Sequence, residues 1–197
     1  MNKSNTIFLI SAVFVAYSLP MSAAVSLGQT TAATTDNLVT YSNPAFGFSI
    51  LYPSNWPKEI SDDPVIGQDA MFLVPTSPIK YLEKVDVSVT NQTHNSLKAE
   101  VDYLINFNKH ENPALGGSNY QVIESVPITV NGNIDAYKLV TTFYDKQKVK
   151  DVKSLQIFML QGGKLYNIHY SAELGKYDSL LPTVQKMIDS FQFISTR

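Results

Sequence analysis

The chain has 197 residues, a formal net charge of −2, no cysteine and a single arginine, Arg197. This length fits one domain plus an extension, and the lack of cysteine excludes a disulfide framework, a thiolate metal site and a cysteine nucleophile. Arginine carries the planar fork that proteins commonly use to hold phosphates. With one arginine and no basic cluster, the composition argues against a nucleic-acid partner.

The N-terminal segment has the pattern of a secretory signal. Lys3 is followed by an apolar run at residues 7–19, Pro20 ends this run, and residues 22–24 are small. We therefore predict a signal peptide over residues 1–24, with cleavage after Ala24, and a secreted or otherwise extracytoplasmic protein. A bilayer-spanning helix needs about 20 apolar residues, so an uncleaved N-terminal membrane anchor is the less favoured alternative.

A linker and several strands are predicted next. Residues 25–38 are small and polar, which is typical of a flexible linker, so the folded domain is expected over residues 39–195. Alternation of apolar and polar residues predicts three strands, at residues 46–53, 69–75 and 85–92. In the third of these the valines should face the core, while Asp86 should face outward.

A helix follows these strands. Asn95 or Ser96 can cap its N-terminus, and Leu97, Val101, Leu104 and Ile105 repeat at helical spacing. Pro113 should end the helix, because proline supplies no backbone N–H and disfavours helical geometry in the residue before it.

Two β-hairpins and a closing helix complete the chain. Asn131-Gly132 and Gly162-Gly163 are strong signals for type I′ turns, which need a positive φ at both central positions. The four hairpin strands are predicted at residues 120–130, 134–144, 152–161 and 164–172. The closing helix should run from Tyr177 to about Phe191, with Pro182 in its first turn, where a missing N–H is harmless.

Together these elements predict an α+β fold, an antiparallel β-sheet flanked by helices. The segment LQIFML, residues 155–160, is apolar on both of its faces. We expect it to form a central strand that is covered on both sides of the sheet.

The stretch YSNPAFGFSILYPSNW, residues 41–56, carries the one resemblance to a known family. Its aromatic-Gly-Phe strand, proline and following tryptophan resemble the opening of the PsbP-like family, at Gly47, Phe48, Pro53 and Trp56. The order of the later elements is also similar to that family's. Core packing of these aromatic residues is the favoured interpretation, and an aromatic cage for a ligand is the alternative.

The resemblance implies a PsbP-like α/β/α sandwich over roughly residues 41–194. The best-known member of that family is an extrinsic subunit of photosystem II, linked to retention of calcium and chloride, and other members are exported or lumenal proteins with assembly or unknown roles. The resemblance therefore implies the fold without naming the partner.

The chain contains three histidines as candidate catalytic groups: His94, His110 and His169. His169 lies on the more polar face of its predicted strand, with Ser171 two residues along on the same face. A hydrolase built on His169 and Ser171 is the lowest-ranked hypothesis, because no nucleophile turn surrounds the serine. We therefore predict no catalytic residues and no enzymatic activity.

Acidic and charged segments are candidate binding sites. Glu59, Asp62, Asp63 and Asp69 lie close in sequence, but calcium needs six to eight oxygen ligands and the spacing of an EF-hand is absent. A solvated loop is the favoured interpretation, so no metal site and no cofactor are predicted.

The sequence Asn91-Gln92-Thr93 is a glycosylation sequon. The charged loop at residues 145–153 is interpreted as a solvated connection, with docking to an acidic partner or a lipid headgroup as the alternative.

The predicted function is that of an exported, non-enzymatic domain that binds a protein partner or assists assembly outside the cytoplasm. The alternative is a carrier of a small ligand or of a divalent metal such as calcium or manganese. Association with a membrane surface is a further possibility that the charged loop leaves open.

Overall fold

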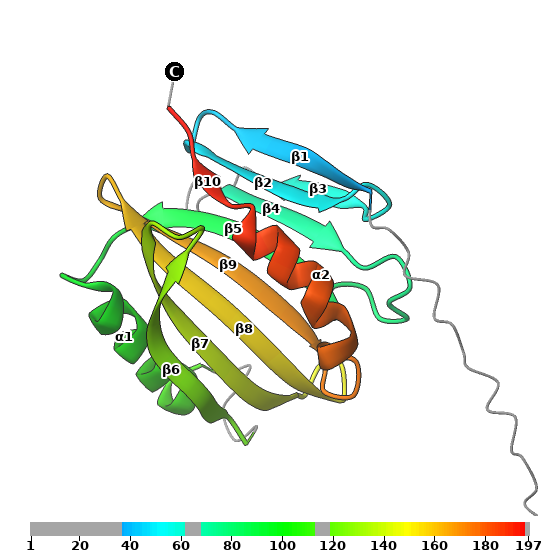
Figure 1. Cartoon of the computed structure of the whole chain (residues 1–197). Coiled ribbons are helices and arrows are strands. Elements are labelled where there is room, and N and C mark those ends of the chain that lie inside the picture. The colour runs from blue at the N-terminus through cyan, green and yellow to red at the C-terminus, as the bar shows by residue number, and fades with distance from the viewer. Residues whose placement is uncertain (1–36, 62–67, 113–118, 196–197) are drawn as a thin grey trace, which may run out of the picture. The chain divides into compact units, whose positions relative to one another are not determined.

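A computed structural model describes residues 37–61, 68–112 and 119–195 (Figure 1). The predicted signal peptide, nearly all of the linker and Pro113 lie outside these residues. The elements in chain order are β1 (Leu38–Asn43), β2 (Phe48–Pro53), β3 (Lys58–Ser61), β4 (Gln68–Leu73), β5 (Lys84–Asn91), α1 (Leu97–His110), β6 (Gln121–Val130), β7 (Ile134–Asp145), β8 (Lys150–Gln161), β9 (Lys164–Glu173), α2 (Tyr177–Asp189) and β10 (Gln192–Phe193).

The strands form two antiparallel sheets. The larger sheet has seven strands in the order β3-β4-β5-β9-β8-β7-β6, and the smaller has three in the order β1-β2-β10. The two predicted hairpins are β6–β7 and β8–β9, and both central residues of each turn have positive φ: Asn131, Gly132, Gly162 and Gly163. The antiparallel prediction is confirmed, whereas β1, β3, β10 and the division into two sheets were not predicted.

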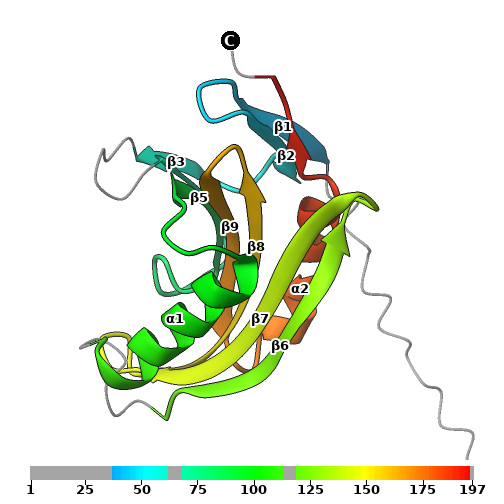
Figure 2. The same ribbon diagram turned by 90° about the vertical axis from the view of Figure 1, so that its left-hand side faces the viewer.

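The helices lie on opposite faces of the larger sheet (Figures 1 and 2). Neighbouring residues of β8 show this, because Ile157 packs in the main core with α2, while Phe158 packs with Val101 of α1. Side chains alternate between the two faces of a strand. The prediction of a central strand covered on both sides is therefore confirmed for β8.

The sandwich arrangement is confirmed only in part. One layer contains α1, but the opposite layer contains α2 together with the three-stranded sheet, whose strand β2 contributes Phe48 and Ile50 to the same core as α2. The described residues thus form mostly antiparallel β-structure with two helices. In the described part of the chain, neither helix has the length and apolar character that crossing a membrane requires.

The two helices begin as predicted. Ser96 caps α1, and its hydroxyl accepts a hydrogen bond from the backbone N–H of Ala99 at 3.2 Å. In α2, however, the prediction for Pro182 is wrong. The helix starts at Tyr177, so Pro182 lies in its second turn and supplies no N–H to the carbonyl of Asp178.

The aromatic stretch at the start of the domain packs mainly in the core. Phe48 is completely buried and stacks on Phe191 with a centroid separation of 5.8 Å, and Trp56 is also buried. The core interpretation is confirmed for these residues. Phe46 is only half-buried, because it lies in the turn before β2, and this turn forms one wall of a pocket.

Candidate functional site

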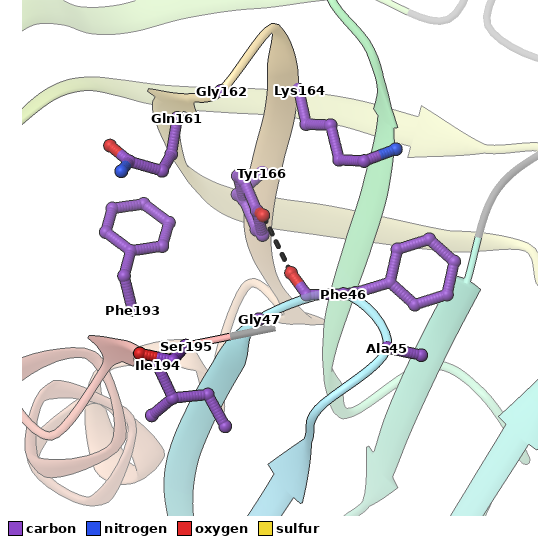
Figure 3. A pocket seen from close by; sticks show the side chains of 10 residues that line it. All are labelled: Ala45, Phe46, Gly47, Gln161, Gly162, Lys164, Tyr166, Phe193, Ile194 and Ser195. Atoms are coloured by element: carbon purple, nitrogen blue, oxygen red, sulfur yellow. Dashed lines mark hydrogen bonds between the residues drawn. The ribbon is translucent and has the colours of Figure 1, made fainter. Parts of the chain in front are cut away.

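An open pocket of about 560 Å³ lies where three distant segments of the chain meet (Figure 3). One wall is the turn that contains Phe46 and Gly47, a second is the β8–β9 hairpin with Lys164, and the third is the C-terminal strand with Phe193 and Ile194. Tyr166 lies between these walls. The lining is mixed, because aromatic side chains lie beside the polar groups of Gln161, Lys164 and Ser195.

The turn at Phe46 is held by four hydrogen bonds to the backbone. The N–H of Gly47 donates to the carbonyl of Asn43 at 2.8 Å, and the carbonyl of Gly47 accepts from Ile194 at 2.9 Å. The side-chain oxygen of Asn43 accepts from the N–H of Phe46 at 3.2 Å, and the Tyr166 hydroxyl donates to the carbonyl of Phe46 at 2.7 Å (Figure 3). Gly47 has a φ of +70°, which explains why glycine is needed at this position.

The pocket combines aromatic surface with one positive charge. Phe193 packs edge-on against Tyr166 at 4.9 Å, and the Lys164 ammonium lies 5.7 Å from the centre of the Phe46 ring. Among the described residues no carboxylate lies within ion-pair distance of Lys164. Burial raises the pKa of Tyr166, so its hydroxyl stays protonated and continues to donate at neutral pH. The pocket is therefore suited to an apolar segment that carries a negative charge.

A second cluster gathers around His169 on the α1 face of the larger sheet. Its Nε2 atom lies 2.9 Å from the Ser154 hydroxyl, and its Nδ1 atom lies 3.4 Å from Oδ1 of Asp86. Lys84 reaches the same Asp86 oxygen at 2.6 Å. The hypothesis that joined His169 to Ser171 is wrong, because the Ser171 hydroxyl donates to the carbonyl of Leu82 instead.

Asp86 also departs from its predicted outward position, since only 6% of its surface is exposed. Burial alone would raise the pKa of this carboxyl, but its electrostatic interactions with His169 and Lys84 outweigh burial and lower the pKa to about 2. Asp86 therefore remains ionised although it is buried, with Lys84 and His169 as its partners.

The order serine, histidine, aspartate is that of a hydrolase triad, but the surroundings differ from those of a reaction centre. Ser154 is 1% exposed and lies within β8, between β7 and β9. Its backbone groups belong to the ladders of these neighbours, so they do not form the free N–H pair of an oxyanion hole. A substrate carbonyl would also need access to the serine oxygen, and burial denies that access.

The other predicted candidates are scattered over the fold. The His94 ring lies 2.9 Å from a carboxylate oxygen of Glu100, while His110 lies in the last turn of α1. Glu59 lies on β3, an exposed edge strand, and its carboxylate pairs with the Lys80 ammonium at 3.0 Å. Asp62 and Asp63 lie outside the described residues. Within the described ranges, no three acidic, histidine or cysteine residues gather as a metal site would require.

Three lysines of the charged loop, residues 145–153, pair with carboxylates of the same chain. Lys148 pairs with Asp145 at 2.9 Å, and Lys150 pairs with Glu173 at 2.8 Å. These contacts agree with a solvated connection between β7 and β8.

Sequence reasoning missed several residues of the two sites. It did not identify Lys164 and Phe193 in the pocket, or Ser154 and Asp86 in the cluster around His169, because no short motif links positions so far apart in sequence.

Comparison with known proteins identifies relatives of this fold. The sequence profile described as PsbP matches residues 36–193. The solution structure of cyanobacterial PsbP (CyanoP) from Synechocystis sp. PCC 6803 is similar, with 21% identity over 85% of this chain and 98% of that chain and a TM-score of 0.60. The Ran-binding protein Mog1p of Saccharomyces cerevisiae shares the fold at 9% identity, over 82% of this chain and 98% of that chain, with a TM-score of 0.54. A search of curated protein sequences finds no significant match.

Proposed function

This chain belongs to the PsbP family, and from that premise we propose that it is an exported, non-enzymatic protein that binds a protein partner outside the cytoplasm through the pocket formed by Phe46, Lys164, Tyr166 and Phe193. The pocket is the observation that carries the proposal. It combines two half-buried aromatic rings, Phe46 and Phe193, with a lysine that has no carboxylate within ion-pair distance among the described residues.

Two further points support a protein partner. Yeast Mog1p, which has the same fold, is named as a Ran-binding protein, so this architecture can present a protein-binding surface. The signal pattern at residues 1–24 supports export. The non-enzymatic part of the proposal rests on the burial of Ser154 and on the engagement of its backbone in the sheet.

The test is capture of the partner from the extracytoplasmic fraction of the native host, with the full-length chain as bait. Lys164→Glu reverses the charge of the pocket, and Lys186→Glu makes the same change at an exposed lysine of α2. We expect the wild type and Lys186→Glu to recover the same protein, and Lys164→Glu to recover about tenfold less, because a like charge now opposes the acidic partner.

The outcomes separate the parts of the proposal. Equal recovery by all three baits would remove the pocket from the binding surface. If the wild type recovers no stoichiometric protein but retains a small molecule in its mass spectrum, the carrier function replaces the partner-binding function.

A further inference from the structure

A second cleft, of about 170 Å³, lies between the segment that follows β4 and the start of α2. It shares no lining residue with the pocket at Phe46. Its walls combine apolar side chains, hydroxyls and one charge of each sign, contributed by Val74, Leu180, Ser77, Ser179, Glu83 and Lys176. Neither the proposed partner site nor the His169 cluster uses these residues.

Glu83 is the unusual member of the cleft. Only 1% of its surface is exposed, which is rare for a carboxylate. Its Oε2 atom accepts a hydrogen bond from the Ser77 hydroxyl. Its Oε1 atom is buried and accepts no hydrogen bond from the described part of the chain. A buried charged oxygen without a donor is energetically unfavourable, so this atom is an open acceptor for a ligand.

Lys176 supplies the positive charge beside Glu83. The Lys176 ammonium lies 3.5 Å from Glu83 Oε1, within ion-pair range but without the geometry of a hydrogen bond. The Lys176 side chain is 42% exposed, so its ammonium can move into solvent when a second cation takes its place beside the carboxylate. Lys176 thus neutralises Glu83 without filling the acceptor position.

We propose that this cleft binds a primary ammonium group carried on an aliphatic stem, with Glu83 Oε1 as its acceptor and Lys176 as an intramolecular competitor. The ammonium supplies the missing donor and a positive charge. The stem packs against Val74 and Leu180, as the methylenes of lysine do on apolar surfaces. An anion is repelled by Glu83, and a calcium ion finds one carboxylate where it needs six to eight oxygen ligands.

The proposal is independent of the partner that the pocket at Phe46 is proposed to hold. Two sources supply this chemistry, a free alkylamine and a lysine side chain of another protein. The first probe is n-butylammonium, titrated into the full chain and followed by backbone amide NMR spectra. We expect saturable shifts at Ser77, Glu83 and Ser179, and no such shifts with n-butanol or pentanoate, which have the same butyl stem without the cation.

Three variants make the test specific. Lys176→Met removes the competitor and should tighten n-butylammonium binding several-fold. Glu83→Gln should abolish the binding, whereas Glu59→Gln, which removes the exposed carboxylate paired with Lys80, should leave it unchanged. If Glu83→Gln does not fold, Lys176→Met still tests the proposal. Binding of n-butylammonium to Lys176→Met that is unchanged or weaker than in the wild type would overturn it.

The same titration distinguishes the sources and the trivial outcome. Binding of a capped Gly-Lys-Gly peptide at the same amides points to a lysine side chain, and binding of n-butylammonium alone points to a free amine. Shifts that spread over surface carboxylates, or that persist in Glu83→Gln, would mean non-specific cation binding and would overturn the proposal. None of these results depends on whether Lys164 contacts a partner.

Discussion

At the scale of single residues, Asp86 shows how a strand can bury a charge on its polar face. It lies on β5, opposite His169 of β9, and Lys84 lies two residues earlier on the same face. Each of these side chains is long or polar enough to be exposed by itself. Together they form a charge cluster that removes most of Asp86 from solvent and keeps it ionised.

The stability of the protein should depend on this carboxylate in acid. The pKa of Asp86 is lowered from 3.8 to about 2, which corresponds to about 2 kcal/mol of native-state stabilisation. Because the folded-state pKa is below the unfolded-state value, the stabilisation is present above about pH 4 and is lost as the pH falls toward 2. Asp86→Asn should therefore lower the free energy of unfolding, relative to the wild type, by about 2 kcal/mol more at pH 5 than at pH 2. Urea unfolding at the two pH values measures this difference.

The matched control is Asp189→Asn, which removes an exposed carboxylate of α2. We expect its unfolding free energy to follow the wild type at both pH values. If Asp86→Asn lowered the free energy of unfolding by the same amount at pH 5 and at pH 2, the substitution would disturb packing and not charge.

At the scale of elements, the connection from β5 to α1 is organised by Glu100. Its carboxylate accepts from the backbone N–H groups of Thr93 and His94, both at 2.7 Å, and from the Thr93 hydroxyl at 2.9 Å. The His94 ring adds a further contact at 2.9 Å. One side chain from the first turns of α1 thus fixes the path of the chain into the helix, in addition to the cap by Ser96.

We expect Glu100→Ala to destabilise the fold by about 2 kcal/mol, because several donors lose a charged acceptor at once. Urea unfolding monitored by circular dichroism measures this loss. Asp102→Ala is the control, since Asp102 lies on the same helix and pairs with Lys98 at the surface, where an ion pair contributes little. If both substitutions had the same small effect, the connection would not depend on Glu100.

At the scale of the whole molecule, both sheets share one core. Phe48 of the smaller sheet, Tyr166 of the larger sheet and Phe191 after α2 have ring centroids 5.8 to 6.4 Å apart. Aromatic residues of this size dominate the energy of a core. Loss of any one of these rings therefore weakens the contact between the two sheets and α2 together.

The described domain should unfold in one cooperative step. Trp56, the only tryptophan, reports on the segment after β2, whereas far-ultraviolet circular dichroism is dominated by the larger sheet and the helices. We expect the two signals to give coincident urea transitions. Phe191→Ala should lower the unfolding free energy by about 3–5 kcal/mol and shift both transitions equally.

Ile123→Ala provides the comparison for this prediction, because Ile123 is an exposed apolar residue of the edge strand β6. It should change stability little. A tryptophan transition that precedes the circular-dichroism transition in Phe191→Ala would instead show that the three-stranded sheet separates from the rest before global unfolding.

The sequence by itself determined the local structure. Alternation at period two marked the long strands, the pairs Asn131-Gly132 and Gly162-Gly163 marked the turns, and the pair Asn95-Ser96 marked the start of α1. The sequence predicts these features because each depends on residues that are close together in the chain. The opening aromatic stretch also led to the PsbP family.

Only the tertiary structure decided which elements share a sheet and which side chains meet. The hydrogen bond from Tyr166 to Phe46 joins residues 120 positions apart, and the His169 cluster takes its members from three strands. Periodicity states which face of an element is apolar but not which other element covers that face. That choice depends on packing across the complete core, and the pocket at Lys164, the ionised Asp86 and the open acceptor of Glu83 are all consequences of it.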